Sequence, residues 1–261
     1  MTRLFRSLEE RTETVAIKEE HIIIENMFNV NTARPQSAYN EVRTPIEIYT
    51  RYKIMRNLQL HQLRVAAVGK MICDNLFWPI DTNAVVVACL FHDMGNILKF
   101  NLAYFPESLE PEGLKYWENV KSEYTKKYGM NQHGATKKIA EEIGLQEAVI
   151  KCIDAVGFSK AGEVLKSDSY EKKICEYSDM RVGPHGVLSL EERVMDGRKR
   201  YLARGVSSQL SVLETADRFD ELLMVSRELE KQIFASEGIK PEDITDSAIK
   251  ETMEKLREYS V

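Results

Sequence analysis

Several kinds of residue are scarce in this 261-residue chain, and each scarcity excludes a class of protein. Only 13 glycines and 7 prolines occur, which excludes collagen-like and low-complexity chains. No segment approaches the roughly 18 consecutive apolar residues of a membrane-spanning helix. The cysteines Cys73, Cys89, Cys152 and Cys175 form no CxxC pair, so we expect free thiols in a reducing compartment and a cytoplasmic location.

An excess of positive charge is also missing. The chain has 36 lysines and arginines against 41 aspartates and glutamates, which gives a formal net charge of −5. A protein without a global basic field has no general attraction for long nucleic acid or for an anionic membrane. The composition does supply 43% hydrophobic residues, enough for a substantial core in one large domain.

Capped helical segments follow one another along most of the chain, and few segments alternate in the manner of a strand. Thr44, Pro45 and Glu47 form a capping box that predicts a helix over residues 45 to about 58. A second helix is expected to begin at His61. Residues 82 to about 92 are almost wholly apolar and follow a capping aspartate, which favours a buried helix over a buried strand. The pattern predicts an all-α fold.

The predicted helices fall into a main domain with an extension at each end. Further helices are expected over residues 131–143, 146–156, 169–181, 189–203, 207–236 and 246–259. Residues 101 to 130 are interpreted as an insertion, a loop followed by a short exposed helix. We take residues 1–43 as an N-terminal extension, 44–205 as the main domain and 206–261 as a C-terminal helical extension. The apolar stripe of residues 207–236 predicts packing on the main domain or, as the alternative, a homodimer.

Only five histidines occur, and two of them accompany carboxylates in apolar surroundings. His92 and Asp93 stand together at the end of the apolar segment, His61 lies 31 positions before His92, and Asp179 lies 86 positions after Asp93. A single histidine at a helix end is more often a cap or a surface residue than a metal ligand. Four such groups on three core helices, however, leave several buried polar atoms unpaired unless a cation joins them.

These residues and their surroundings resemble the HD superfamily, a family of all-helical metal-dependent phosphohydrolases. The segments HQLRVAAVGKMI, ACLFHDMGN and YSDMR are similar to those that carry the family's ligands, and the resemblance covers about residues 45 to 200. It implies that residues 44–205 are an HD domain, a helical bundle around a metal site, and that His61, His92, Asp93 and Asp179 bind a divalent cation. Two imidazoles and two carboxylates suit Mn, Fe, Ni, Co or Zn better than Mg.

The resemblance also suggests residues that assist the chemistry. A metal with open positions can acidify a bound water for attack on phosphorus, and Asp93 is expected to orient that water. Arg64, one turn after His61, is the first candidate for binding phosphate, because a guanidinium can contact two phosphoryl oxygens. Surface solvation is the alternative for Arg64. Weaker candidates for phosphate are Lys99, Lys160 and Arg181.

A second metal is less well supported by the sequence. His133 lies in a segment where some HD enzymes supply a histidine for a second metal or for the substrate phosphate, and the alternative is a solvent-facing residue near a helix start. Asp154 falls where dinuclear relatives often carry further histidines, and none is present here. We therefore do not expect a six-ligand dinuclear site.

Departures from the family pattern narrow the expected reaction. Asn96 replaces the lysine of the HD-GYP phosphodiesterases and no GYP triplet occurs, while the HD-fold oxygenases need further histidines that this chain lacks. We expect an enzyme that hydrolyses a phosphoester or phosphoanhydride of a small phosphorylated substrate, with a nucleotide as the leading candidate. Two alternatives stay open: a non-catalytic HD module that binds a nucleotide or partner protein as a sensor, and a phosphodiesterase acting on RNA ends.

Overall fold

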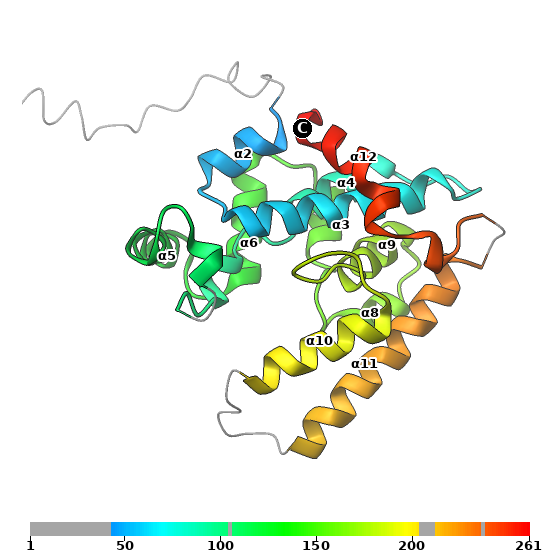
Figure 1. Cartoon of the computed structure of the whole chain (residues 1–261). Coiled ribbons are helices and arrows are strands. Elements are labelled where there is room, and N and C mark those ends of the chain that lie inside the picture. The colour runs from blue at the N-terminus through cyan, green and yellow to red at the C-terminus, as the bar shows by residue number, and fades with distance from the viewer. Residues whose placement is uncertain (1–42, 104–105, 204–211, 236–237) are drawn as a thin grey trace, which may run out of the picture. The chain divides into compact units, whose positions relative to one another are not determined.

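The computed structural model describes residues 43–103, 106–203, 212–235 and 238–261, and the predicted N-terminal extension lies almost wholly outside them. Within these residues the chain is all-α, with eleven α-helices and no strand. In chain order the elements, with η for a 3-10 helix, are α2 (Pro45–Arg51), α3 (Arg56–Asp74), α4 (Thr82–Phe91), η2 (Asn96–Lys99), η3 (Pro106–Leu109), α5 (Leu114–Tyr128), α6 (Gln132–Ile143), α7 (Glu147–Ile153), α8 (Ala161–Leu165), α9 (Tyr170–Met180), α10 (Leu190–Ala203), α11 (Val212–Ile233), η4 (Pro241–Asp243), α12 (Asp246–Lys255) and η5 (Leu256–Glu258) (Figure 1).

Helix α4 forms the centre of the core. Its N-terminus is capped by Asp81, whose Oδ1 accepts a hydrogen bond from the backbone N–H of Ala84 at 2.9 Å. Every residue from 84 to 91 is buried, and the helix packs against α3, α7 and α9. A helix that is apolar on all sides needs neighbours on all sides. The apolar segment is therefore a helix, as its cap predicted, and not a buried strand.

The prediction of one helix from residue 45 to about 58 is wrong, because this helix ends at Arg51. The chain leaves the helix after α2, and Lys53 adopts a left-handed φ of 51° before α3 begins at Arg56. This turn allows Tyr49 and Met55 to enter the core from either side of the break. As a result His61 lies in the second turn of α3, rather than at the start of a helix as the sequence suggested.

The insertion is more ordered and more buried than the sequence predicted. Helix α5 spans 15 residues and buries one face, which includes Trp117 and Tyr124. Trp117 Nε1 donates to the carbonyl of Leu109 at 3.1 Å, and the Tyr124 hydroxyl donates to the carbonyl of Tyr52 at 2.5 Å. The aromatic residues that suggested an exposed helix are the ones that attach this helix to the rest of the domain.

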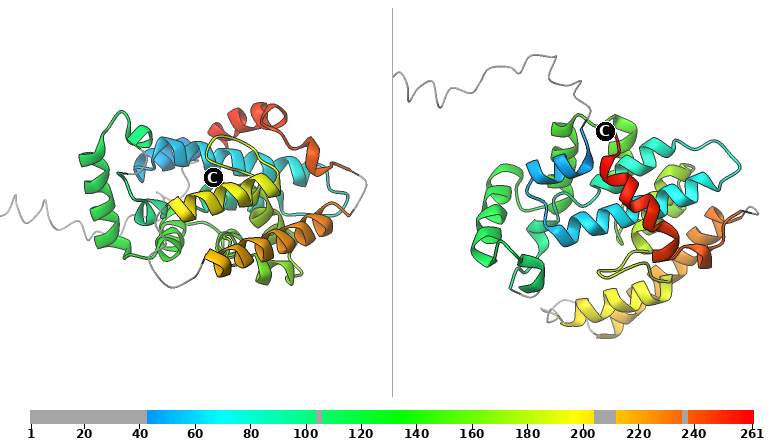
Figure 2. Two further views of the ribbon diagram at one scale, coloured as in Figure 1. Left: turned by 60° about the horizontal axis from the view of Figure 1, so that its bottom comes forward. Right: turned by 45° about the horizontal axis from the view of Figure 1, so that its top comes forward.

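The C-terminal helices pack on the helices that precede them. Helix α12 lies across α3, and α11 runs beside α10 and also contacts α8 and α9 (Figures 1 and 2). Leu222 and Leu229 of the predicted stripe are buried in this way, and so is Ile233. The start of that stripe, residues 207–211, lies outside the described residues, and the homodimer stays a prediction. Among the described residues no helix is both long and apolar enough to cross a membrane.

Candidate metal centre

The ends of three core helices bring together four polar side chains of the sequence prediction. His61 comes from α3, His92 is the C-terminal cap of α4, and Asp179 lies in the last turn of α9. Asp93 follows His92 in the turn after α4. Because α3, α4 and α9 pack against one another, residues that are far apart in sequence meet at one place.

The distances within this cluster are those of a group built around a common centre. Asp179 Oδ1 lies 3.0 Å from His61 Nε2 and 3.4 Å from His92 Nε2. Asp93 Oδ2 lies 3.8 Å from His61 Nε2 and 3.7 Å from His92 Nε2. Ligand atoms of His61, His92 and Asp179 all lie within 4.8 Å of one another. Adjacent ligands of a transition metal at about 2.1 Å are about 3 Å apart, so the spacing fits a cation.

The second nitrogen of His92 shows how the imidazole is oriented. His92 Nδ1 lies 2.8 Å from the carbonyl oxygen of Cys89, so Nδ1 carries the proton and donates it. Nε2 is then free to face the cluster, where it is buried without a hydrogen-bond partner. An imidazole held by its far nitrogen, with the near nitrogen unpaired beside two carboxylates, is the usual arrangement of a metal-binding histidine. The residues present therefore fit a divalent cation.

The pKa values of the cluster show strong coupling between acid and base. Burial of His92 lowers its pKa, but the carboxylates of Asp93 and Asp179 outweigh burial and raise the pKa to about 10. Burial raises the pKa of Asp179, but the neighbouring imidazoles of His61 and His92 overcome that effect and hold the pKa well below its ordinary value. A cation that binds here must displace a proton from His92, so its affinity depends on pH.

The turn that carries Asp93 is held against both α3 and α6. The backbone N–H of Asp93 donates to Gln62 Oε1 at 3.1 Å, and the N–H of Gly95 donates to Thr136 Oγ1 at 2.9 Å. A Cβ at Gly95 would overlap the carbonyl oxygen of Gln132 and lie 2.9 Å from the backbone nitrogen of Thr136. Only glycine permits this close approach, which accounts for the glycine two positions after Asp93.

The predicted phosphate-binding residues lie in less favourable places. Arg64 is partly buried, and its Nε lies 3.6 Å from Asp246 Oδ1 of α12. Arg181 is engaged by the protein itself, since it donates to the carbonyls of Leu188, Pro241 and Ile244 and to the Tyr177 hydroxyl. These hydrogen bonds join α9 to the C-terminal segment and use the guanidinium nitrogens of Arg181, so its phosphate role stays a prediction that the structure does not favour.

The remaining candidates are not members of the described cluster of candidate ligands. His133 is exposed on α6, and its Cε1 is 3.4 Å from the position that a Cβ on Gly157 would occupy. Asp154 and Lys160 each form an exposed ion pair. Lys137 Nζ lies 3.2 Å from Asp154 Oδ2, and Lys160 Nζ lies 3.4 Å from Glu163 Oε2. None of these residues belongs to the described His and Asp cluster.

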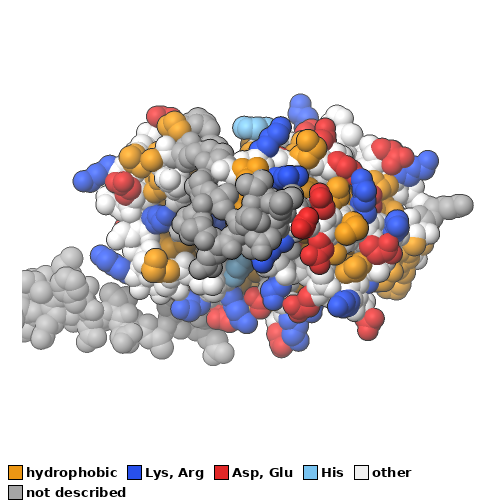
Figure 3. Space-filling view, turned by 90° about the horizontal axis from the view of Figure 1, so that it is seen from below, with side chains coloured by type: hydrophobic (Ala, Val, Ile, Leu, Met, Phe, Trp, Pro, Cys, Tyr) orange, Lys and Arg blue, Asp and Glu red, His pale blue; other side chains and the backbone are white. Residues whose placement is uncertain are grey.

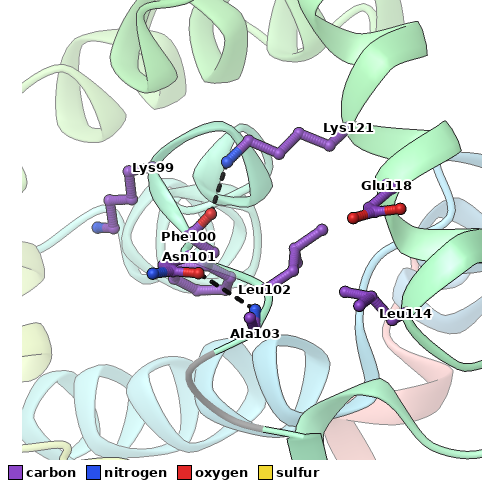
Figure 4. Close-up of a pocket in the computed structure, with 8 residues that line it drawn as sticks. All are labelled: Lys99, Phe100, Asn101, Leu102, Ala103, Leu114, Glu118 and Lys121. Atoms are coloured by element: carbon purple, nitrogen blue, oxygen red, sulfur yellow. Dashed lines mark hydrogen bonds between the residues drawn. The ribbon is translucent and has the colours of Figure 1, made fainter.

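Lys99 lines a separate cavity of about 510 Å³ between the turn after η2 and helix α5. In Figure 4 Lys121 and Glu118 extend from α5 toward this turn, and Lys121 Nζ donates to the carbonyl of Phe100 at 2.5 Å. The metal-ligand candidates do not line this cavity. It is therefore a feature of the insertion rather than part of the metal centre.

Two residues beside the centre were missed by the sequence reasoning. Glu176, one turn before Asp179, is fully buried, and its Oε2 accepts the backbone N–H of Gly157 at 2.6 Å. Burial raises the pKa of Glu176 to about 8. Arg193 of α10 is also buried. The three-residue spacing from Asp179 could have identified Glu176, because both lie on one helix face. Nothing in the sequence pointed to Arg193, whose position depends on how α10 folds back.

Comparison with known proteins gives one result. A search of curated proteins and a search of solved structures found no significant match. The family model of the HD domain matches residues 59–222, which is more than half of the chain and ends within α11. The matched region contains His61, His92, Asp93 and Asp179, in an all-α structure that brings these four together. The chain therefore belongs to the HD domain family.

Proposed function

We propose that this protein is a metal-dependent phosphohydrolase that cleaves a phosphoester or phosphoanhydride bond. The observation that carries the proposal is the unpaired, buried Nε2 of His92, which faces two carboxylates while Nδ1 is fixed on the Cys89 carbonyl. His61, His92, Asp93 and Asp179 would hold the cation, and a transition metal such as Mn, Fe, Ni, Co or Zn suits these ligands. When bound, such a cation acidifies a water and polarises a phosphoryl oxygen.

The residues of the chain would position the reacting groups. Asp179 contacts both histidines and would fix the distance between them. Asp93 is the less constrained carboxylate, since its Oδ2 lies 3.7 to 3.8 Å from the two imidazole nitrogens. A carboxylate in this position can accept a hydrogen bond from the attacking water and hold the proton that the water loses. Asp93 is thus the proposed catalytic base, while His133 and Arg64 are proposed to contact the substrate.

A small phosphorylated molecule, with a nucleotide as the leading candidate, is the proposed substrate. The chain is acidic overall, and acidic and basic side chains are interspersed where the described residues form the face in Figure 3. A polymer such as RNA is ordinarily bound along a continuous basic track. The charge distribution on this face supports a compact substrate more than an RNA end.

A hydrolysis screen with added metal tests the proposal. Purified protein would be loaded with Mn²⁺, Fe²⁺, Ni²⁺, Co²⁺ or Zn²⁺ and assayed against nucleoside mono-, di- and triphosphates, cyclic nucleotides and short RNA. We expect turnover of at least one small substrate and its loss in Asp93→Asn. Nucleotide binding without turnover would favour a sensor, and turnover of RNA alone would favour the phosphodiesterase alternative.

A further inference from the structure

Three arginines are close in sequence or by contact to the candidate ligands, and they differ in how their nitrogens are used. Arg64 follows His61 by three residues, Arg181 follows Asp179 by two, and Arg193 donates to the carbonyl of Val182, three residues after Asp179. Arg64 faces Asp246, and Arg181 donates to four acceptors. Arg193 donates only from Nε, to the carbonyl of Val182 at 2.8 Å. Its Nη1 is buried without a partner. Arg193 is therefore the arginine of this group whose terminal nitrogens are not engaged by described residues.

The surroundings of Arg193 fix the guanidinium in place. The residue is only 7% exposed, and its Cζ lies 4.9 Å from the centroid of the Phe158 ring. Burial lowers the pKa of Arg193, while the carboxylates of Asp179, Asp196 and Asp93 act in the opposite direction. An arginine keeps its charge in a protein. The two carboxylates of the metal centre thus lie within electrostatic range of a fixed positive charge.

The charges of the site do not balance when a metal is bound. A divalent cation neutralises Asp93 and Asp179, and the two imidazoles bind it in their neutral form. Glu176 does not compensate the charge of Arg193. Burial raises the pKa of Glu176 to about 8, so its carboxyl is largely protonated and neutral at a lower pH. A buried charge without a counter-ion is unfavourable. Asp196, the other carboxylate that acts on Arg193, is paired with Arg200 at 2.6 Å. The metal-loaded site is therefore short of one negative charge beside Arg193.

We infer that Arg193 makes the metal-loaded centre an anion site and binds the phosphoryl group of the substrate. This inference rests on the proposed function and assigns to Arg193 the role that the sequence suggested for Arg64. A tetrahedral oxyanion supplies both the missing negative charge and an acceptor for the unpartnered nitrogen, and a guanidinium is suited to such a ligand. Because the charge is buried, salt screens its effect much less than that of a surface lysine.

The test measures metal and phosphate binding separately on the full-length protein. Mn²⁺ is titrated into metal-free protein by calorimetry, and inorganic phosphate is then titrated into the Mn²⁺-saturated protein. The variants are Arg193→Gln, which removes the charge, and Arg193→Lys, which keeps it. Lys199→Gln, an exposed residue on the same helix, is the matched control. Arg193→Met keeps an apolar stem against Phe158 and replaces the glutamine variant if that variant does not fold.

An electrostatic role predicts shifts of opposite sign. Without the positive charge Mn²⁺ should bind about 3- to 10-fold more tightly, because a repulsion is removed. Phosphate should bind about 10- to 100-fold more weakly, because its charged partner is lost. Arg193→Lys should stay closer to the wild type in both, and Lys199→Gln should change neither by more than about twofold.

Three results would overturn the inference. Weaker binding of both Mn²⁺ and phosphate in the neutral variant would show that Arg193 only supports the structure. Unchanged binding of both would show that its charge does not reach the site. A wild-type protein that binds Mn²⁺ but no phosphate would show that no anion site exists. Phosphoester hydrolysis is assayed separately, so failure of the proposed function is recognised by the turnover assay and not by these binding shifts.

Discussion

The two nitrogens of one imidazole explain much of the candidate site. His92 Nδ1 is committed to the Cys89 carbonyl within the last turn of α4, so Nε2 must point out of the helix end toward α3 and α9. There it meets Asp179 Oδ1 at 3.4 Å and Asp93 Oδ2 at 3.7 Å. A lone histidine at a helix end would need no such partners. The hydrogen bond at Nδ1 orients the imidazole, and the carboxylates lie near Nε2. Together these two features distinguish a metal ligand from a helix cap.

Replacing His92 by alanine should therefore abolish metal binding. Removal of one of four ligands weakens a site by on the order of 100-fold or more, because loss of a residue that merely supports a ligand already costs about 10- to 100-fold. Metal content after purification, measured by elemental analysis, checks this. His133→Ala is the control, since His133 is exposed and lies outside the His and Asp cluster. Equal metal content in both variants would contradict the assignment.

Glu176 should make the stability of the metal-free protein depend on pH. Burial raises its pKa from the ordinary 4.5 to about 8. A raised pKa in the folded state gives a contribution that is complete below pH 4.5 and is lost as the pH rises through 8. Glu176→Gln should remove this loss, so that the difference in unfolding free energy between wild type and variant changes by roughly 2–4 kcal/mol across that window.

Urea unfolding of both proteins in the presence of chelator, from pH 4.5 to pH 8.5, measures the difference. Taking the difference between the two proteins cancels the titration of groups that do not interact with Glu176, whereas the influence of His92 on Glu176 is part of the shift that is measured. Parallel curves for wild type and Glu176→Gln would show that the Glu176 carboxyl titrates as it does in water.

At this scale the sequence pointed to the candidate metal ligands better than to their neighbours. His92 and Asp93 stand out because they end an almost wholly apolar segment, and His61 and Asp179 are recognisable through the resemblance of their surroundings to the HD family. Arg193 has no such signal, since α10 is amphipathic and rich in charge, and only the turn after α9 brings it beside the site. The contacts of Arg181 could not be predicted either. Its closeness to Asp179 in sequence says nothing about acceptors that lie 60 or more positions further along.

At the scale of helices and turns, the contact between the Asp93 turn and α6 is the tightest constraint on the site. Gly95→Ala should destabilise the protein by about 2–3 kcal/mol, because the added methyl group overlaps backbone of α6. It should also weaken metal binding, since the turn that holds Asp93 must move. Thermal and urea unfolding, together with metal content, measure both effects.

Gly134→Ala provides the matched control within α6. Apart from the backbone of its own helix, the nearest atom to a Cβ there would be Asn131 Oδ1 at 3.6 Å, and the backbone is helical. Alanine should stabilise the helix by about 0.5–1 kcal/mol. If Gly95→Ala were as stable as Gly134→Ala, the turn would have room to relax and would not constrain Asp93.

Helix boundaries could be predicted where a side chain caps the helix and not where tertiary packing decides. Asn131 and Ser169 accept hydrogen bonds at the starts of α6 and α9, as their positions in the sequence indicated. The break at Lys53 has no glycine or proline to announce it, and it exists because residues on both of its sides are buried. The burial of α5 likewise depends on distant partners, such as the Tyr52 carbonyl.

At the scale of the whole molecule, the C-terminal segment stabilises the helices that carry the metal centre. Arg181 lies two positions after Asp179 and donates to the carbonyls of Pro241 and Ile244. Helix α12 covers α3, the helix of His61 (Figure 2). The segment therefore contacts two of the three helices that supply ligands, although it contributes no ligand itself.

Ending the chain at Gly238 should consequently unfold the protein or cause it to aggregate. The deletion removes Ile239, Ile244, Ile249 and Leu256, all of which are buried. At about 1.5–3 kcal/mol for each large aliphatic side chain, the loss is at most roughly 6–12 kcal/mol, comparable to the whole stability of a typical domain. Circular dichroism and light scattering of the truncated protein check this, with Lys250→Ala on the exposed side of α12 as the control. A truncated chain that stays monomeric, helical and metal-loaded would show that α3 and α9 hold the metal centre without the covering segment.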